Sequence, residues 1–418
     1  MSYRAIGARS YAVVLLVGSL AFPGVSTAAL TLNEAIDLAE QQAPSLAART
    51  ANLQAAESLV TPAGELPDPK LKLGVQNLPI EGESSLRLGA ERMTMQMVGV
   101  MQEVPNRAKR RARVRTAEAS AELARVQRTV ERLKVRQLTA EAWIATLSAQ
   151  QKLDIFEQLY VENRLLAQAV KARIAGGRGL SSDSVLPKQE AALLAEKQDA
   201  LVRNEAVARA ELRRWIGEAA SEPLEGSWPV WPGDFQHYRH NLHRHPELLA
   251  FDPMINRAEA KIAEAVSDKR PDWAWGLDYQ HRGNGYGDMV SFNVSFDLPV
   301  FAGSRQDPKI SAERARLAEV EAERQAMLRM HDQELAAELA EMQRLEQALE
   351  RVDKTLLPLA EEKVRLAMAD YRSGKSELTA VIAARQELVE TRLRRVELAG
   401  DRSMINARLH FSFGDILP

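Results

Sequence analysis

The sequence repeats one pattern of secondary structure, and this duplication constrains the fold more than any other feature. After residues 1–28, residues 29–225 form a first repeat and residues 226–418 a second. Each repeat is predicted to run helix, β-hairpin, very long helix, glycine-bearing turn and returning helix. Internal similarity on this scale indicates one architecture built from two like units.

The N-terminal segment 1–28 has the pattern of a cleaved secretory signal peptide. Arg4 and Arg9 provide its basic start, an apolar stretch runs from Ala12 to Phe22, and small residues precede Ala29. The apolar stretch is shorter than the ~20 residues of a membrane-spanning helix, and no later apolar run reaches that length. We therefore expect an exported chain that enters a membrane only through strands.

Composition favours long, solvated helices over a compact catalytic core. Basic and acidic residues are balanced, at 55 Lys+Arg against 57 Asp+Glu, which argues against a nucleic-acid partner. Cysteine is absent and aromatic residues make up 5%, so stability must come from helix packing and oligomerisation. No triad spacing, HExxH motif or phosphate loop is present, and we expect neither enzymatic activity nor a cofactor.

Each repeat contains two segments in which polar and apolar residues alternate, the pattern of a strand with one apolar face. They lie at about 70–79 and 92–104 in the first repeat, and at about 272–281 and 288–300 in the second. The clearest example sets Val290, Phe292 and Val294 against polar neighbours. A length of ~10 residues suits a tilted membrane-spanning strand.

Long helices follow the hairpins. The first is predicted at about 107–175 and the second at about 308–372, interrupted at Pro358. At ~1.5 Å per residue such helices approach 100 Å, and their apolar residues step by threes and fours as in coiled coils. Returning helices are predicted at about 180–217 and 377–409.

A shorter helix opens the first repeat. Thr31 and Glu34 have the spacing of a capping box, which predicts a helix from there to about Val60. Pro44 is expected to kink this helix without ending it.

Strand number determines the expected assembly. Four strands cannot close a barrel, and open sheet edges are not tolerated in lipid. Three copies supply ~12 strands, enough for a water-filled lumen. The expected fold class is therefore mainly α with a membrane β-barrel, in a homotrimer whose helices form a long periplasmic tube. The residues expected to line the barrel lumen are polar: Asp278, Gln280, Ser291, Asn293, Ser295 and Asp297.

The order of elements resembles the TolC family of outer-membrane efflux proteins over both repeats. Residues 67–71 (PDPKL), 74–79 (GVQNLP), 93–100 (MTMQMVGV) and 102–105 (QEVP) are similar to its heavy-metal, CzcC/CusC-like branch. The resemblance implies a passive exit duct of a tripartite pump that spans the outer membrane. Its partners would be a periplasmic adaptor (membrane fusion) protein and an inner-membrane RND-type pump, and its cargo heavy-metal cations. A multidrug exporter duct, a type I protein-secretion duct and a non-channel coiled-coil stalk are the alternatives.

The resemblance also places an adaptor-docking tip at the turns between long and returning helices. The tip residues would be Gly176, Gly177, Leu180, Gly374 and Leu378, and the gate candidates are the acids Asp183, Asp370 and Glu377. A three-fold ring of Asp183 would attract cations at a narrow mouth, whereas the simpler interpretation is an ordinary helix N-terminal charge. Ala380 and Ala383 occupy positions where some family members carry aspartates.

Two groups of residues could bind metal. Met93, Met95, Met97 and Met101 alternate along the second strand, and thioethers suit Cu(I) or Ag(I). Aligning Val104 with Phe301 puts these methionines on the face of Val290, so we expect them to face lipid; a one-residue shift would reverse this.

Four histidines lie in the segment that joins the repeats: His237, His240, His243 and His245. Imidazoles could bind Zn, Cu or Ni. Because acidic or cysteine partners at regular ligand spacing are missing, apart from Asp234 and Glu247, a surface connector is the favoured interpretation.

Overall fold

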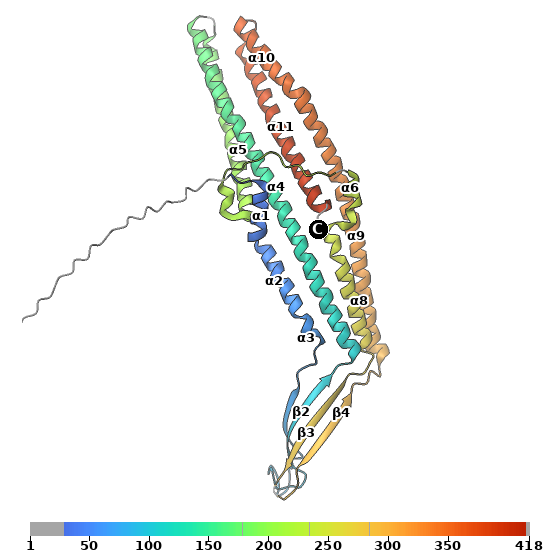
Figure 1. The fold of residues 1–418 in the computed structure, drawn as a ribbon. Coiled ribbons are helices and arrows are strands. Elements are labelled where there is room, and N and C mark those ends of the chain that lie inside the picture. Colours follow the sequence, from blue (N-terminus) through green and yellow to red (C-terminus); the bar gives the residue numbers. More distant parts are fainter. Residues whose placement is uncertain (1–28, 178, 234, 284, 415–418) are drawn as a thin grey trace, which may run out of the picture.

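The chain forms an elongated molecule with helices along most of its length and a small sheet at one end (Figure 1). The computed structural model describes residues 29–177, 179–233, 235–283 and 285–414. The expected signal peptide, residues 1–28, lies outside the described residues. The predicted fold class, mainly helical with a small sheet of four strands, is confirmed for one chain.

The two halves of the chain carry the same order of major elements. The first half contains α1 (Leu32–Gln42), α2 (Pro44–Ser58), α3 (Val60–Gly64), β1 (Lys70–Gln76), β2 (Met95–Val104), α4 (Arg107–Ala175), η1 (Ser181–Ser184), α5 (Leu186–Ile216) and η2 (Gly217–Ser221). The second half contains α6 (Phe235–His240), η3 (Leu242–Arg244), α7 (Pro246–Leu249), α8 (Phe251–Ser267), β3 (Trp273–Arg282), β4 (Met289–Phe296), α9 (Ala302–Arg351), η4 (Val352–Leu356), α10 (Leu357–Ser373) and α11 (Leu378–Phe413).

The opening helix differs from the expectation at Pro44. The capping box is confirmed, since the Glu34 N–H donates to Thr31 Oγ1 at 3.4 Å and the Thr31 N–H donates to Glu34 Oε2 at 2.9 Å. The expected kink is instead a break, because Ala43 is extended with ψ 115° and α2 starts afresh at Pro44. Proline lacks an N–H and disfavours helical backbone in the residue before it.

The two long helices differ in their proline content. α4 contains none and runs unbroken for 69 residues, which corresponds to ~100 Å. In the second half the helix begins at Ala302, ahead of the expected start at Pro308, and contains that proline. A π-helical turn, η4, precedes Pro358, whose missing N–H cannot continue the α-helical hydrogen bonds.

The main core lies where helices of both halves meet. Ile36 of α1, Trp143 of α4, Leu212 of α5 and Phe411 of α11 belong to one buried cluster. The Trp143 indole N–H donates to the Leu30 carbonyl at 3.3 Å, so the largest buried side chain also has its polar atom paired. α8 packs against both α4 and α9 and extends this contact toward the sheet.

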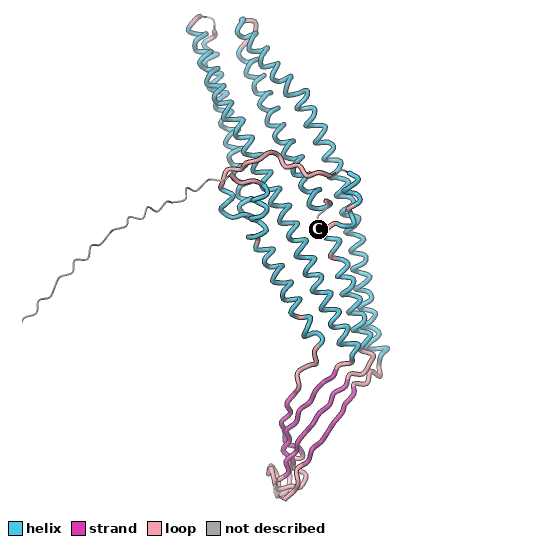
Figure 2. The backbone as a smooth tube through the Cα atoms, viewed as in Figure 1, coloured by secondary structure: helices cyan, strands magenta, loops and turns pink. Residues whose placement is uncertain are grey.

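The strands, drawn in magenta in Figure 2, lie together at one end of the molecule. The sheet has the order β1-β2-β3-β4 and is antiparallel throughout. β2 and β3 form its centre, so strands from the two halves pair directly, with Met95 opposite Arg282 and Val104 opposite Trp273. β1 and β4 are the edges. At the junction with the helices, the Asn106 N–H donates to Asp272 Oδ1 at 2.7 Å and links the two halves.

No helix in the described parts of the chain is both long enough and apolar enough to span a membrane.

Candidate functional site

One face of the sheet is apolar and exposed. Leu71, Val100, Leu277 and Phe292 are successive partners across the four strands, and directly opposed residues share a face. Leu71 and Phe292, on the edge strands, are each 67% exposed in the single chain. A continuous exposed apolar surface of this kind marks contact with lipid or with another chain.

The opposite face is polar and partly covered. Lys72, Gly99, Asp278 and Ser291 are successive partners across the strands. Asp278 is 5% exposed, and its Oδ2 accepts a hydrogen bond from Asn293 Nδ2 at 2.9 Å. This face holds the expected lumen residues of the strands: Asp278, Gln280, Ser291, Asn293 and Ser295. β4 ends at Phe296, so Asp297 lies just beyond the strand.

The methionine row lies on the polar face, so the expectation that it shares a face with Val290 is wrong. Met97 pairs with Gln280 and Met101 with Gly276, whereas Val98 pairs with Tyr279 on the apolar face. Aligning Val104 with Phe301 puts β2 and β4 out of register by an odd number of residues, and such a shift moves every side chain to the other face. Met93 lies before β2 and is exposed.

The tips consist of two helical hairpins, α4 with α5 and α10 with α11, that lie side by side at the end opposite the sheet (Figure 1). Gly177 has φ +70° and Gly374 φ +79°, backbone conformations that favour glycine at the turns. Leu378 is buried in a cluster with Val170 and Tyr371, which joins the hairpins. Leu180 is exposed. Gly176 ends α4 with φ −81°.

Arg173 of α4 reaches across to the second hairpin. Its guanidinium lies 4.1 Å from the centroid of the Tyr371 ring and donates a hydrogen bond to the Tyr371 carbonyl. Burial raises the pKa of Tyr371 and the Asp183 carboxylate adds to the rise, whereas Arg173 opposes it. A cleft of about 1170 Å³ between the hairpins is lined by residues of both.

A buried charge cluster lies further from the tips and was not predicted. Arg385 of α11 is buried, with its Nη2 3.6 Å from Glu162 Oε2 and its Nε 3.9 Å from Glu190 Oε1. Burial raises the pKa of Glu190, and Arg385 counteracts this. These residues come from α4, α5 and α11, so the cluster links both hairpins. No local motif marks them, because each resembles the many exposed charges on the same helices.

The three gate candidates occupy different environments. Asp183 is half-buried in η1, where its Oδ2 accepts a hydrogen bond from the Leu180 N–H at 3.2 Å. Asp370 and Glu377 are exposed on either side of the turn at Gly374. Asp183 is therefore the least exposed of the three candidates.

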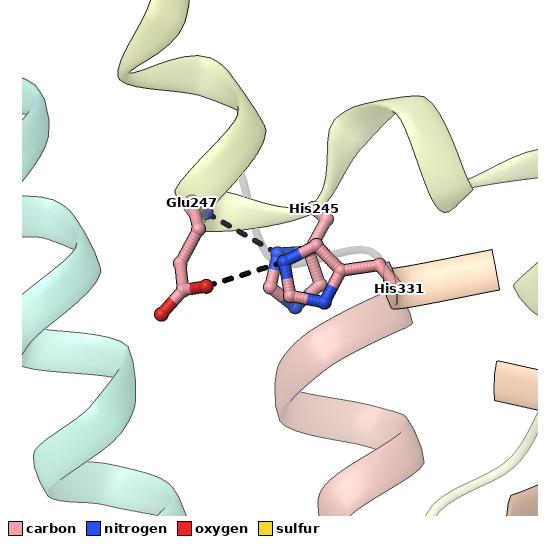
Figure 3. Close-up of side chains that lie close together, drawn as sticks. All are labelled: His245, Glu247 and His331. Carbon is pink, nitrogen blue, oxygen red and sulfur yellow. Dashed lines mark hydrogen bonds and ion pairs between the residues drawn. The ribbon is translucent and has the colours of Figure 1, made fainter. Parts of the chain in front are cut away.

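The structure separates the four connector histidines. His240 and His243 are exposed, and His237 contacts Tyr238 and Asn241 within the connector. His245 alone points inward and stacks on His331 of α9, with 3.5 Å between ring centroids (Figure 3). Among the described residues, His245, Glu247 and His331 are the one set of three histidine, cysteine or acidic side chains close enough together to hold a metal ion.

The two stacked histidines have different charge environments. Burial lowers the pKa of His245 to about 4, and the neighbouring His331 contributes to the fall. Burial also opposes charge on His331, but the carboxylates of Glu247 and Glu334 outweigh it and raise the pKa of His331. Sequence reasoning missed His331; a histidine on the apolar seam of a coiled-coil helix was its only signal.

Comparisons with known proteins agree with this architecture. Residues 238–415 match the family of outer membrane efflux proteins. The cobalt-zinc-cadmium resistance protein CzcC of Cupriavidus metallidurans is 24% identical over 389 residues, which cover 91% of this chain and 88% of CzcC.

Solved channel structures share the fold along the chain. The outer membrane protein VceC of Vibrio cholerae has a TM-score of 0.76 at 18% identity, over 92% of this chain and 96% of VceC. CusC has a TM-score of 0.77 at 14% identity, over 92% of each chain. The open-state MtrE channel of Neisseria gonorrhoeae has a TM-score of 0.73 at 17% identity, over 92% of this chain and 88% of MtrE. The chain therefore has the fold of these channels, and its second half matches the outer membrane efflux protein family.

Proposed function

We propose that three copies of this chain form an outer-membrane exit duct that passively conducts heavy-metal cations. Their strands close a barrel of ~12 strands, and their helices form a tube that extends into the periplasm. The energy for export comes from partner proteins, because diffusion through an open duct needs none.

The observation that carries this proposal is the exposed apolar row Leu71–Val100–Leu277–Phe292 on a sheet with two open edges. Unpaired strand edges cost several kcal/mol per unsatisfied group in lipid, so β1 of one copy must pair with β4 of another. Closure turns the apolar face to lipid and the Asp278 face to the lumen.

The cargo is inferred from the relative and from the polar face. CzcC is described as a cobalt-zinc-cadmium resistance protein, and the similarity to it covers nearly all of this chain. The face that would line the lumen carries the Asp278 carboxylate together with the thioethers of Met97 and Met101. Oxygen and sulfur ligands of this kind attract cations without enclosing them.

The proposed partners meet the chain at the helical tips. A periplasmic adaptor docks at the turns of the two hairpins, where Leu180 and the turn at Gly374 are exposed, and connects the duct to an RND-type pump. The cleft between the hairpins and the Arg173 contact give the tip separate parts that adaptor binding can rearrange.

Disulfide trapping tests the closure directly, because the natural chain contains no cysteine. Leu71→Cys on β1 is combined with a cysteine at 290, 292 or 294 on β4 and oxidised in outer membranes. One combination is expected to give covalent trimers on a non-reducing gel. Leu71→Cys combined with Lys171→Cys, on the distant tip, is the control and should stay monomeric. Absence of any β1–β4 cross-link across the scan would contradict barrel closure by three copies.

A further inference from the structure

We propose that His245, Glu247 and His331 form a binding site for one divalent transition-metal cation such as Zn²⁺ within the helical body. The site is separate from the proposed lumen face and from the tips, because His245 caps α7, Glu247 lies in α7 and His331 lies in α9. It therefore does not depend on which cargo the duct carries.

The ligand atoms are already gathered. One donor atom from each residue lies within 4.8 Å of the others, and His331 Nε2 is 3.2 Å from Glu247 Oε2. Ligand atoms of a tetrahedral zinc site with bonds of ~2.0–2.1 Å are roughly 3.4 Å apart, so only small movements are required. Two imidazoles and one carboxylate are a ligand set that Zn²⁺, Co²⁺ and Ni²⁺ accept, with water in the remaining position.

His331 is oriented as metal-binding histidines are. Its Nδ1 lies 2.9 Å from Glu334 Oε2, one turn along α9, which directs Nε2 toward Glu247 (Figure 3). A carboxylate on the distal ring nitrogen fixes the tautomer and strengthens the ligand nitrogen. His331 is 3% exposed, so this geometry is held by the surrounding helices.

The other two ligands come from one short turn. His245 precedes Pro246 and caps α7, accepting at Nδ1 from the Glu247 N–H at 3.3 Å. Because the His245 and His331 rings are stacked with 29° between their planes, the His245 ring must rotate about its Cβ–Cγ bond to point its lone pair at the ion. His245 Nδ1 then exchanges the hydrogen bond from the Glu247 N–H for the metal. Such terminal torsions are soft.

Space and charge around the site also suit a hydrated cation. A cavity of about 350 Å³ adjoins the three ligands and is bordered by α4 and α11 as well. Glu334 and Lys134 both line the cavity, and the hydrogen bond from His331, with a smaller contribution from Lys134, lowers the pKa of Glu247. A bound ion would tie the connector between the repeats to the second long helix, which adds stability to the folded state by mass action.

Equilibrium dialysis of the purified, chelator-treated trimer against Zn²⁺ tests the site. Wild-type protein is expected to bind one Zn²⁺ per chain, and Glu247→Gln and His331→Ala to lose it. His243→Ala, an exposed histidine of the same connector, is the matched control and should retain the ion. Glu334→Gln should weaken binding about 10–100-fold. Glu247 is exposed, so its variant reports on binding even if His331→Ala fails to fold.

Co²⁺ supplies a second measurement, since tetrahedral coordination gives intense visible absorption that Glu247→Gln should abolish. No bound Zn²⁺ in the wild type, or equal binding by the wild type and Glu247→Gln, would overturn the proposal. Metal binding by the purified protein does not depend on whether the duct carries metals, drugs or proteins. The proposed metal site can therefore be disproved while the proposed cargo stands, and the reverse is also possible.

Discussion

Gly99 lies directly opposite Asp278 across β2 and β3, so closely that a Cβ atom at Gly99 would be 1.9 Å from Asp278 Oδ1. The carboxylate occupies the space that any other residue would fill. In this space Asp278 Oδ2 accepts a hydrogen bond from Asn293 Nδ2 at 2.9 Å.

Gly99→Ala is therefore expected to displace Asp278 and to lower the cation selectivity of the reconstituted channel. Gly74→Ala is the matched control on the same face, because its Cβ would meet only the end of Met97 at 3.7 Å. Reversal potentials in a salt gradient measure the effect. Identical selectivity in both variants would show that Asp278 does not face the conduction path.

Asp183→Asn tests the gate. Asparagine can still accept the hydrogen bond from the Leu180 N–H, so the turn is expected to stay intact while a ring of charge is lost. We expect lower cation preference and altered resting conductance in planar bilayers. Asp370→Asn, at an exposed position near the other turn, serves as the comparison. Unchanged conductance in Asp183→Asn would remove it from the gate.

Arg385→Ala is expected to destabilise the helical end by on the order of 3 kcal/mol, because it leaves Glu190 buried without its cation. Thermal unfolding in detergent measures this loss. The double variant Arg385→Met with Glu190→Gln should recover most of it, since no uncompensated charge remains. Equal instability of the single and double variants would contradict an ionic origin.

Glu338 gives the molecule a pH-dependent stability. Burial raises the pKa of Glu338 to about 7, assisted by Glu334 and Glu141 and opposed by Arg408. When folding raises the pKa of an acid, the free energy of unfolding falls as pH rises. For Glu338 this loss of stability occurs between about pH 4.5 and pH 7.

Glu338→Gln should therefore raise the melting temperature at pH 8 relative to the wild type, with a smaller difference at pH 4.5. Glu341→Gln, at a half-buried position on the same helix where the carboxylate pairs with Arg344, should give no such gain. A wild-type melting temperature independent of pH across this range would count against the raised pKa.

Patterns within short stretches of sequence were sufficient to predict the fold class. The alternation through Val290, Phe292 and Val294 predicts a strand with one apolar face, and its structural partners Tyr279, Leu277 and Trp275 have the same pattern. The capping box at Thr31 similarly needs only neighbouring residues. Each of these signals depends on a few consecutive residues, which a sequence displays directly.

Features that depend on distant residues were the ones missed. The face of the methionine row follows from pairing between β2 and β3, and the register that sets Asp278 opposite Gly99 is not specified by alternation within either strand. His331 and His245 lie in separate elements and meet only through packing of α7 against α9. The face of the methionine row was therefore predicted wrongly because it depends on long-range strand register. The contact between His245 and His331 was missed because it depends on helix packing.

Metal tolerance of cells that lack this chain, with its pump and adaptor intact, tests the central claim most directly. Loss of the chain is expected to lower tolerance to Zn²⁺, Co²⁺ and Cd²⁺ and to raise cell-associated metal. Reintroducing the wild-type chain should restore both, while drug tolerance stays unchanged throughout. Unchanged metal tolerance together with increased drug sensitivity would contradict a heavy-metal duct.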